Sequence, residues 1–546
     1  MRRFLPLLAL LGSCATVREP GDVRTLQLGS YARPVSTRSA QARDLVHRGL
    51  ALVWGFQRDE GAEAFRQAAK ADPNCALAWW GIAHALGNDI NFTTIEAGPA
   101  GEARAALDRA LAALPYASEV ERAIVRAEDV RHVSPPPQDR KALDQAYAAA
   151  MKDACGKFPD DPDVGTLYAE SLMNLRPWDF WKSDGTPHPG TEDVIAALDR
   201  VLARTPQHPG ANHLYIHILE ASPFPERALA AADRLRSLVP DTAHLLHMPA
   251  HIDVRVGQWE KGAVANERAI EADARYIARR GPDPQYHVYR AHNAHFLAWI
   301  SMVEGRYGRA MEKARELVAG FPAEASGELL GFVDYLTLLP VHVQLRFGRY
   351  EEILAEPQPA EPLKLSRAMW HEARGVAAAA LGKTDMAERE LAAFEAAAAQ
   401  IPEDAKVGIH KARDIAQIGR KLLEGELRFR QGRTDEGLAK LREGVLAEDA
   451  LNYDEPPGWL MPVRHALGAL LLESGKVEEA EAVYREDLKR NRENGWALRG
   501  LLECCERLNR DDLESVRERF NKAWARADTE LRASCFCRAG ARGSNP

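Results

Sequence analysis

The fold is decided by the pattern in one stretch, GAEAFRQAAKADPNCALAWWGIA at residues 61–83. Small and apolar residues recur at helical spacing on both sides of Pro73, which ends the first helix because proline lacks an amide hydrogen. A 34-residue unit accounts for this spacing, with Gly49, Gly61, Phe65, Ala68 and Pro73 at its positions 8, 20, 24, 27 and 32. The next unit begins at Ala76. Glycines at two of these positions let neighbouring helices approach closely. We therefore expect helix pairs that repeat along the chain.

The same period returns over most of the sequence. Pro206 and Pro240 lie 34 residues apart, and later units align on the turn glycines Gly348, Gly382, Gly432 and Gly475. This period and its small residues are typical of the tetratricopeptide repeat (TPR). We predict an all-α fold without strands, a TPR-type helical-repeat solenoid over residues 41–530. A repeat array also accounts for a length of 546 residues, which exceeds one ordinary domain.

The composition narrows the classes of function. Charged residues make up 27% of the chain, the mean hydropathy is −0.35, and no apolar run is long enough to span a bilayer. The net charge of −8 and the lack of a basic cluster argue against a nucleic-acid partner. No phosphate-binding loop, nucleotide fingerprint or Ser-His-Asp motif is recognisable.

The first residues resemble an export signal. Arg2 and Arg3 precede an apolar run that ends in Leu-Gly-Ser-Cys14, which resembles the lipobox of bacterial lipoproteins. We expect a lipoprotein-type signal peptide at residues 1–13, lipidation of Cys14 and a tether at 14–40. The protein would then lie in a bacterial cell envelope, anchored by its lipid on the periplasmic face of the outer membrane. The alternative is an ordinary cleaved signal peptide with an incidental cysteine.

The remaining cysteines have no zinc-ribbon spacing. Cys535 and Cys537 lie in a tail, residues 531–546, that we expect to be partly disordered from Ala539 onward. In an oxidising compartment they would pair with the adjacent Cys504 and Cys505 and fasten the last helix.

Histidines are concentrated in the repeats at residues 209–324. His213 and His217 are four residues apart, as are His247 and His251, so each pair shares one face of a helix. In the repeat register, positions 2, 5, 9 and 12 of the first helix line the concave groove of TPR proteins. These positions hold His213, His247 and His295 (position 5), His217 and His251 (position 9), His244 and His292 (position 2) and Glu220 (position 12).

Imidazoles one helical turn apart converge on a point and suit transition metals. We predict that one or two ions, zinc or copper with iron or manganese as alternatives, bind in the groove of a metalloprotein or metalloenzyme. The candidate ligands are His213, His217, Glu220, His247, His251, His292 and His295, with Glu170, His244, His84 and His342 as additional groove residues. The alternative is a metal-free scaffold that binds a peptide or protein partner at the membrane.

Two neighbouring features bear on this site. Pro249 falls inside a predicted helix, between His247 and His251, and should kink that helix. Trp178 and Trp181 precede the histidine-rich repeats, where they either pack over a helix end or cover the site.

Several strings resemble a family of bacterial TPR proteins. They are CALAWWG (75–81), LYAESLMNLRPWDFW (167–181), NHLYIHILEAS (212–222) and HMPAHI (247–252), with YDEPP (453–457) and EDLKRN (486–491) further on. The resemblance covers most of the chain and includes its histidine strings. It implies the TPR fold and the repeat register, and it implies no particular reaction.

Overall fold

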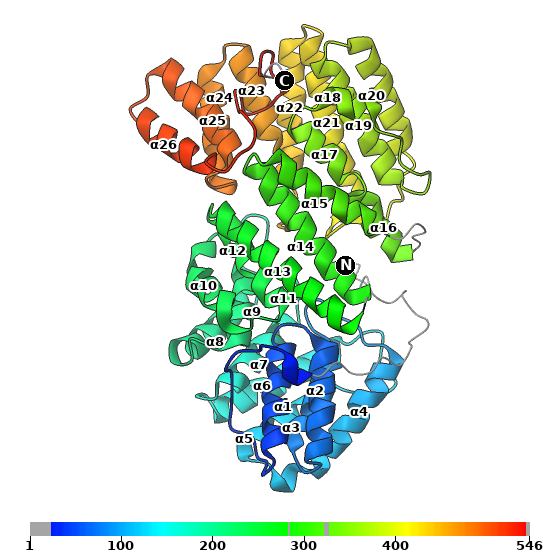
Figure 1. Ribbon diagram of the computed structural model, residues 1–546, viewed down its shortest axis with the longest axis vertical. Helices are drawn as coiled ribbons and strands as arrows, with labels where there is room; N and C mark the ends of the chain where they lie inside the picture. The colour runs from blue at the N-terminus through cyan, green and yellow to red at the C-terminus, as the bar shows by residue number, and fades with distance from the viewer. Residues whose placement is uncertain (1–22, 282–283, 322–326, 542–546) are drawn as a thin grey trace. The chain divides into compact units, whose positions relative to one another are not determined.

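The structure is a computed structural model that describes residues 23–281, 284–321 and 327–541 (Figure 1). The predicted all-α fold of TPR-type helical repeats is confirmed. The chain divides into two compact units. Unit one comprises Met1–Ile252 and Glu267–Arg290, and unit two comprises Asp253–Asn266 and Ala291–Pro546. The predicted signal peptide and Cys14 lie outside the described residues.

The helices of unit one pack against their neighbours along the chain. They are α1 (Ala40–Val53), α2 (Arg58–Ala71), α3 (Ala76–Ala85), α4 (Ala97–Ala112), α5 (Glu119–Asp129), α6 (Lys141–Lys157), α7 (Pro162–Met173), α8 (Thr191–Arg204), α9 (Pro209–Leu219), α10 (Leu229–Leu238), α11 (Ala243–His247) and α12 (Pro249–Arg255), with part of α13 (Trp259–Arg280) and the first turns of α14 (Pro284–Val303). Short 3-10 helices occur at Val23–Thr25, Leu114–Tyr116 and Pro225–Ala228.

The ring of Phe65 lies against two glycines, Gly49 at repeat position 8 and Gly81 in the next repeat. A Cβ atom added to Gly49 of α1 would lie 2.7 Å from this ring, and one added to Gly81 of α3 would lie 2.3 Å from it. Phe65 itself, on α2, is completely buried. Three consecutive helices therefore pack around one aromatic side chain, as the sequence pattern at residues 49–83 indicates.

Unit two continues the repeat with a further set of helices. They are the rest of α14, α15 (Tyr307–Ala319), α16 (Gly327–Leu336), α17 (Leu339–Arg346), α18 (Tyr350–Ala355), α19 (Lys364–Ala380), α20 (Thr384–Ala398), α21 (Ala412–Arg430), α22 (Thr434–Asp449), α23 (Val463–Glu473), α24 (Val477–Arg490), α25 (Gly495–Leu508) and α26 (Leu513–Ala523). The four predicted turn glycines, Gly348, Gly382, Gly432 and Gly475, all have positive φ and join successive helices.

One detail differs from the strand-free expectation. A two-stranded antiparallel hairpin, β1 (Lys406–Val407) with β2 (His410–Lys411), precedes α21. Its loop begins at Gly408, whose φ of 54° is a backbone conformation that favours glycine and suits a two-residue hairpin turn. The hairpin is short and does not interrupt the helical repeat.

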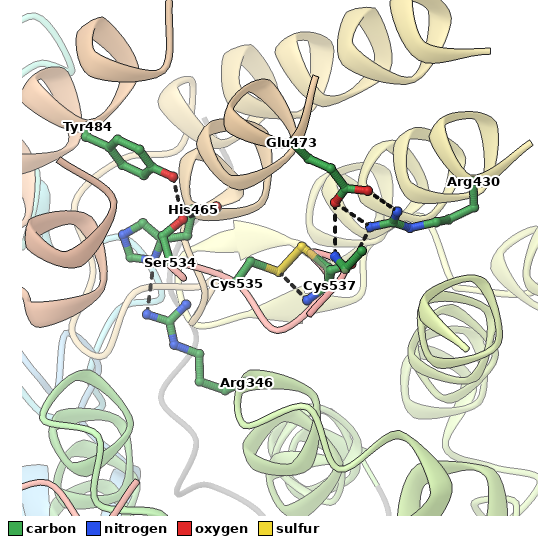
Figure 2. Close-up of a disulfide and its surroundings, with 9 residues drawn as sticks. Arg346, Arg430, His465, Glu473, Tyr484, Ser534, Cys535 and Cys537 are labelled. Atoms are coloured by element: carbon green, nitrogen blue, oxygen red, sulfur yellow. Dashed lines mark hydrogen bonds and ion pairs between the residues drawn. A yellow bond between two sulfur atoms is a disulfide. The ribbon is translucent and has the colours of Figure 1, made fainter. Parts of the chain in front are cut away.

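The segments that flank the repeats pack against them. In place of the tether that we expect, residues 23–39 lie on unit one, where Arg33 forms an ion pair with Asp163 at 2.9 Å. The expected link from the tail to the adjacent cysteines is wrong. Cys535 and Cys537 form a disulfide with each other (Figure 2), whereas Cys504 and Cys505 are free and buried in the described part of unit two.

None of the helices in the described ranges combines the length and the apolar character that crossing a membrane requires.

Candidate metal site

Helix α9 carries the first histidine pair. His208 caps this helix by accepting a hydrogen bond from the Ala211 amide at 3.0 Å, and Pro209 occupies the first turn. His213 and His217 follow one turn apart on the same face. Both side chains are buried, with 1% and 2% of their surface exposed, so they do not line an open groove as the repeat register predicts.

The burial comes from the turn between α1 and α2, residues 54–57. The Trp54 carbonyl accepts a hydrogen bond from Nδ1 of His213 at 2.7 Å. The ring of Phe56 stacks on His217 and His244 at centroid distances of 6.0 and 5.3 Å. This turn is distant in sequence from α9, and no repeat position indicates that it covers the histidines.

The backbone of the covering turn is itself unusual. Phe56 has a φ of 57°, which side chains with a Cβ rarely adopt. A Cβ atom on the adjacent Gly55 would lie 2.2 Å from Thr242 Cγ2. The turn is thus pressed closely against the start of α11. Such backbone strain persists where surrounding structure enforces it, often at functional sites.

The second histidine pair lies on a helix that is broken as predicted. Helix α11 ends at His247 and α12 begins at Pro249, because proline cannot donate the next helical hydrogen bond. The Nε2 atoms of His247 and His251 lie 2.7 Å apart. Pro249 therefore separates the helical segments that carry this pair, and the two rings still meet.

Glu220, at the end of α9, joins the two histidine pairs. Its carboxylate contacts Nδ1 of His217 at 3.2 Å and Nδ1 of His251 at 2.7 Å. Burial alone would raise the pKa of Glu220, but the adjacent His251 and His217 lower it to about 2. Glu220 is thus a carboxylate that orients the Nε2 atoms of two imidazoles, a common arrangement behind metal-binding histidines.

Three histidines come together in unit one. His213, His217 and His244 each offer a ring nitrogen, and these nitrogens all lie within 4.8 Å of one another. We call this set the histidine triad. The Nε2 atoms of His213 and His244 are 3.0 Å apart, close to the roughly 3.3 Å that separates two nitrogens on one tetrahedral zinc ion. In the part of the chain that the structure describes, Nε2 of His217 is buried and has no hydrogen-bond partner.

The surroundings of His213 and His244 favour neutral imidazoles. Burial lowers the pKa of His244 well below its usual range, and the nearby His213 and His217 lower it further. Burial likewise lowers the pKa of His213, and His217 adds to the effect. Both rings are therefore deprotonated at neutral pH, which is the form that binds a metal ion.

Small cavities reach two members of the triad. One is lined by His244 with Phe56 and Tyr289. The other is lined by His213 together with His84 and Glu170. Each is large enough for about one or two water molecules.

The additional candidates His84 and Glu170 form a separate buried group. His84 contacts Glu128 at 3.1 Å and Glu170 at 3.6 Å, and Arg131 pairs with Glu128 at 3.3 Å. Burial would lower the pKa of His84, but Glu170 and Glu128 raise it above its usual value. A protonated imidazole is a poor ligand, so this pair forms an ion-pair network on the wall of the cavity that also reaches His213.

The other predicted ligands belong to unit two. His292 and His295 lie on α14 and His342 lies on α17. The rings of His295 and His342 both flank Tyr335, at 6.2 and 6.1 Å. Burial lowers the pKa of His295 to about 3 and that of His342 to about 4.

The two tryptophans have different roles. The indole of Trp181 donates a hydrogen bond to the Ile218 carbonyl at 2.6 Å, so it packs over the end of α9. Trp178 is 36% exposed and meets the ring of His217 edge-on at 5.0 Å. Trp178 therefore lies over the site. Of the two alternatives that the sequence leaves open, Trp181 packs over a helix end and Trp178 covers the site.

Comparison with known proteins adds few constraints. No family model and no curated protein matches the chain. Solved structures that resemble it include a human IFIT1 dimer with m7Gppp-AAAA (12% identity, TM-score 0.32, covering 93% of this chain and 99% of that chain). Others are the P58(IPK) TPR domain (12%, 0.22, 83% and 100%) and the Cut9–Hcn1 hetero-tetramer of the APC/C (12%, 0.28, 88% and 76%). These are helical-repeat proteins, and the likeness carries no argument about function.

Proposed function

We propose that this chain is an exported, lipid-anchored TPR-type protein that binds a transition-metal ion through His213, His217 and His244. The export and the anchor rest on the sequence around Cys14. The metal site rests on the geometry of the histidine triad in unit one.

The observation that carries the proposal concerns the Nε2 atom of His217. A hydrogen bond between His213 and His244 accounts for two of the three nitrogens. It leaves Nε2 of His217 buried and, among the described residues, without a partner. An unsatisfied buried polar atom costs about 1–3 kcal/mol. A metal ion would satisfy all three nitrogens at once.

The surroundings fit such an ion. The outer nitrogens of His213 and His217 are held by the Trp54 carbonyl and by Glu220, so each ring presents Nε2 inward. Three histidines leave a fourth coordination position open, as in catalytic zinc sites. When bound, the metal would act as a Lewis acid towards water or a substrate in that position.

The argument for a second metal ion is less direct. His247 and His251 present another close pair of nitrogens, and Glu220 connects this pair to His217. Imidazole ligands suit zinc and copper, with iron and manganese as alternatives. One ion at the triad is the core of the proposal, and the second pair defines where another ion would bind.

The test is metal analysis of untagged protein purified without chelator and then offered zinc or copper. We expect at least one equivalent per chain. The variant His217→Gln, which keeps a polar side chain of similar size, should lose it. His371→Gln is the control, because His371 lies on α19 of unit two, contacts Glu390 at 2.7 Å and is not a member of the triad. Stoichiometric metal in His217→Gln, or none in the parent, would overturn the proposal in favour of a metal-free scaffold.

A further inference from the structure

Unit two contains a second cluster of reactive groups. The Sγ atoms of Cys535 and Cys537 and a carboxylate oxygen of Glu426 all lie within 4.8 Å of one another. Glu426 belongs to α21 and is completely buried. Within the described residues, neither of its oxygens has a hydrogen-bond partner. The disulfide thus lies next to a buried carboxyl group for which the described residues provide no hydrogen bond.

The carboxyl group can exchange a proton near neutral pH. Burial raises the pKa of Glu426 to about 7; Arg430 opposes this rise and Glu473 adds to it. Arg430 and Glu473 form a two-point ion pair with each other (Figure 2), at 2.5 and 3.0 Å. The pKa of Arg430 is raised and that of Glu473 is lowered, so both stay charged while Glu426 titrates.

The two sulfur atoms are not equivalent. Cys535 is partly exposed, whereas Cys537 is 3% exposed. The Cys537 amide donates a hydrogen bond to Sγ of Cys535 at 3.1 Å. An amide hydrogen stabilises negative charge on sulfur, so Cys535 is the better placed of the two to exist as a thiolate.

The loop that carries the cysteines is held by contacts other than the disulfide. On one side, Ser534 donates a hydrogen bond to the His465 carbonyl at 2.8 Å. On the other side, Arg430 donates to the Cys537 carbonyl, and the Ala539 amide donates to Glu473 at 3.0 Å. Figure 2 shows Ser534 and His465 on one side of the sulfur atoms and Arg430 and Glu473 on the other. The two thiols would therefore remain adjacent after reduction.

We propose that Cys535–Cys537 is a redox-active disulfide that exchanges with thiol compounds, and that Glu426 transfers the proton to and from Cys537. This proposal is independent of the metal site in unit one. The two reacting cysteines lie in the tail of the chain, after the last helix of the repeats.

The exchange balances in two steps. A thiolate of the reductant attacks Sγ of Cys535, the bond between the two cysteines breaks, and Sγ of Cys537 leaves with the electron pair and takes the Glu426 proton. A second reductant thiolate then attacks the reductant's own sulfur in the mixed disulfide and releases Cys535 as a thiolate. The reductant is oxidised to its disulfide, Cys537 becomes a thiol, and Cys535 remains a thiolate or takes a proton from water according to the pH. In the reverse direction, ionised Glu426 takes the proton of Cys537.

The first experiment measures reduction of the full chain by dithiothreitol between pH 5.5 and 8.5, with acid quenching, alkylation and mass spectrometry of the tail peptide. The rate constant, corrected for the dithiothreitol thiolate concentration, should fall as pH rises through about 7, because Glu426 loses the proton it donates. Glu426→Gln should be about 10-fold slower at pH 6 and should lack this inflection.

The matched control is Glu372→Gln. Glu372 is also completely buried, and neither of its oxygens has a hydrogen-bond partner in the described structure, but it lies on α19 outside the cysteine group. Its rate and pH profile should equal those of the parent. A parental profile in Glu426→Gln, or the same change in both variants, would overturn the role of Glu426.

A second pair of variants tests the assignment of the two sulfurs. Cys537→Ser, which keeps the partly exposed thiol of Cys535, should form a mixed disulfide with 2-hydroxyethyl disulfide at least about 10-fold faster than Cys535→Ser, as peptide mapping would show. Circular dichroism would verify that both fold. Equal rates, or faster reaction of Cys535→Ser, would contradict the proposed exchange.

Discussion

The Nε2 atoms of His213 and His244 face each other at 3.0 Å although the residues lie on α9 and α11. Helix α10 separates these helices in the chain, and successive first helices of neighbouring repeats lie side by side in helical arrays. The repeat thus brings together histidines about one period apart. His217, one turn further along α9, completes the set.

We predict that the protein without metal loses stability as pH falls below about 6.5, the ordinary histidine pKa. Burial and the neighbouring imidazoles lower the pKa values of His213 and His244 in the folded state. The unfolded chain therefore binds more protons in this range, so the free energy of unfolding decreases with decreasing pH. Melting temperatures from pH 7.5 to 4.5 would show the trend. A double variant, His213→Gln with His244→Gln, should show a shallower slope, and an unchanged slope would contradict this assignment.

Metal binding should change how the melting temperature depends on pH. Because protons and the ion compete for the imidazole nitrogens, added zinc should raise the melting temperature most at pH 7.5 and progressively less towards pH 4.5. The lowered pKa values of His213 and His244 should preserve binding at pH 6, where ordinary histidines are mostly protonated. Titration calorimetry at three pH values checks this. Zinc stabilisation that grows as pH falls would exclude histidine ligands.

Phe56→Ala should destabilise unit one. The ring is buried and packs on all three histidines of the triad, and its removal leaves a cavity, so we expect a loss of about 3 kcal/mol in the free energy of unfolding. The variant should also release zinc to a chelator faster than the parent. Denaturant unfolding and a colorimetric chelator measure the two effects. An unchanged release rate would show that Phe56 does not cover the ion.

Gly49→Ala tests the helix packing that defines the repeat. The new Cβ would lie 2.7 Å from the Phe65 ring, so we expect a loss of about 1–3 kcal/mol in the free energy of unfolding. Gly156→Ala in α6 is the control, because its Cβ would meet nothing within 4 Å. Gly156 is the second-last residue of α6 and its φ is not positive, so the change should stabilise by about 0.4–1 kcal/mol, because alanine restricts the unfolded chain. Denaturant unfolding should give opposite signs for the two variants, and equal signs would contradict the packing argument.

Lipidation is a separate prediction about the N-terminus. Expressed with its first residues in a bacterium that processes lipoproteins, the chain should start at an acylated Cys14 and sediment with membranes. Mass spectrometry of the N-terminal peptide tests this. Cys14→Ser should release the protein from the membrane fraction without altering its circular dichroism. Cleavage at another residue without lipid would contradict the prediction.

Much of the fold could be predicted from the sequence because the repeat is local. Gly49, Phe65 and Pro73 specify a helix pair through contacts within 34 residues, and Pro249 marks the break between α11 and α12. The hairpin at residues 406–411 lies outside the repeat period. The repeat pattern therefore does not predict this hairpin.

The site could be predicted only in part. The register identified His213 and His217 as neighbours on one face, but it treated that face as an open groove. What covers a helix face depends on distant segments, and here Trp54 and Phe56 come from a turn about 160 residues earlier. His244, an additional candidate by sequence, belongs to the triad, whereas His295 lies in unit two.

The closed turn at residues 54–57 has a consequence for how an ion would enter and leave. With the Phe56 ring stacked on two imidazoles and Gly55 held against Thr242, a bound ion would exchange only when this turn opens. Loading would then be easiest while the chain is still folding. Once folded, the protein would retain its ion through slow release as well as through affinity, and its metal content would reflect the ions present while it folded.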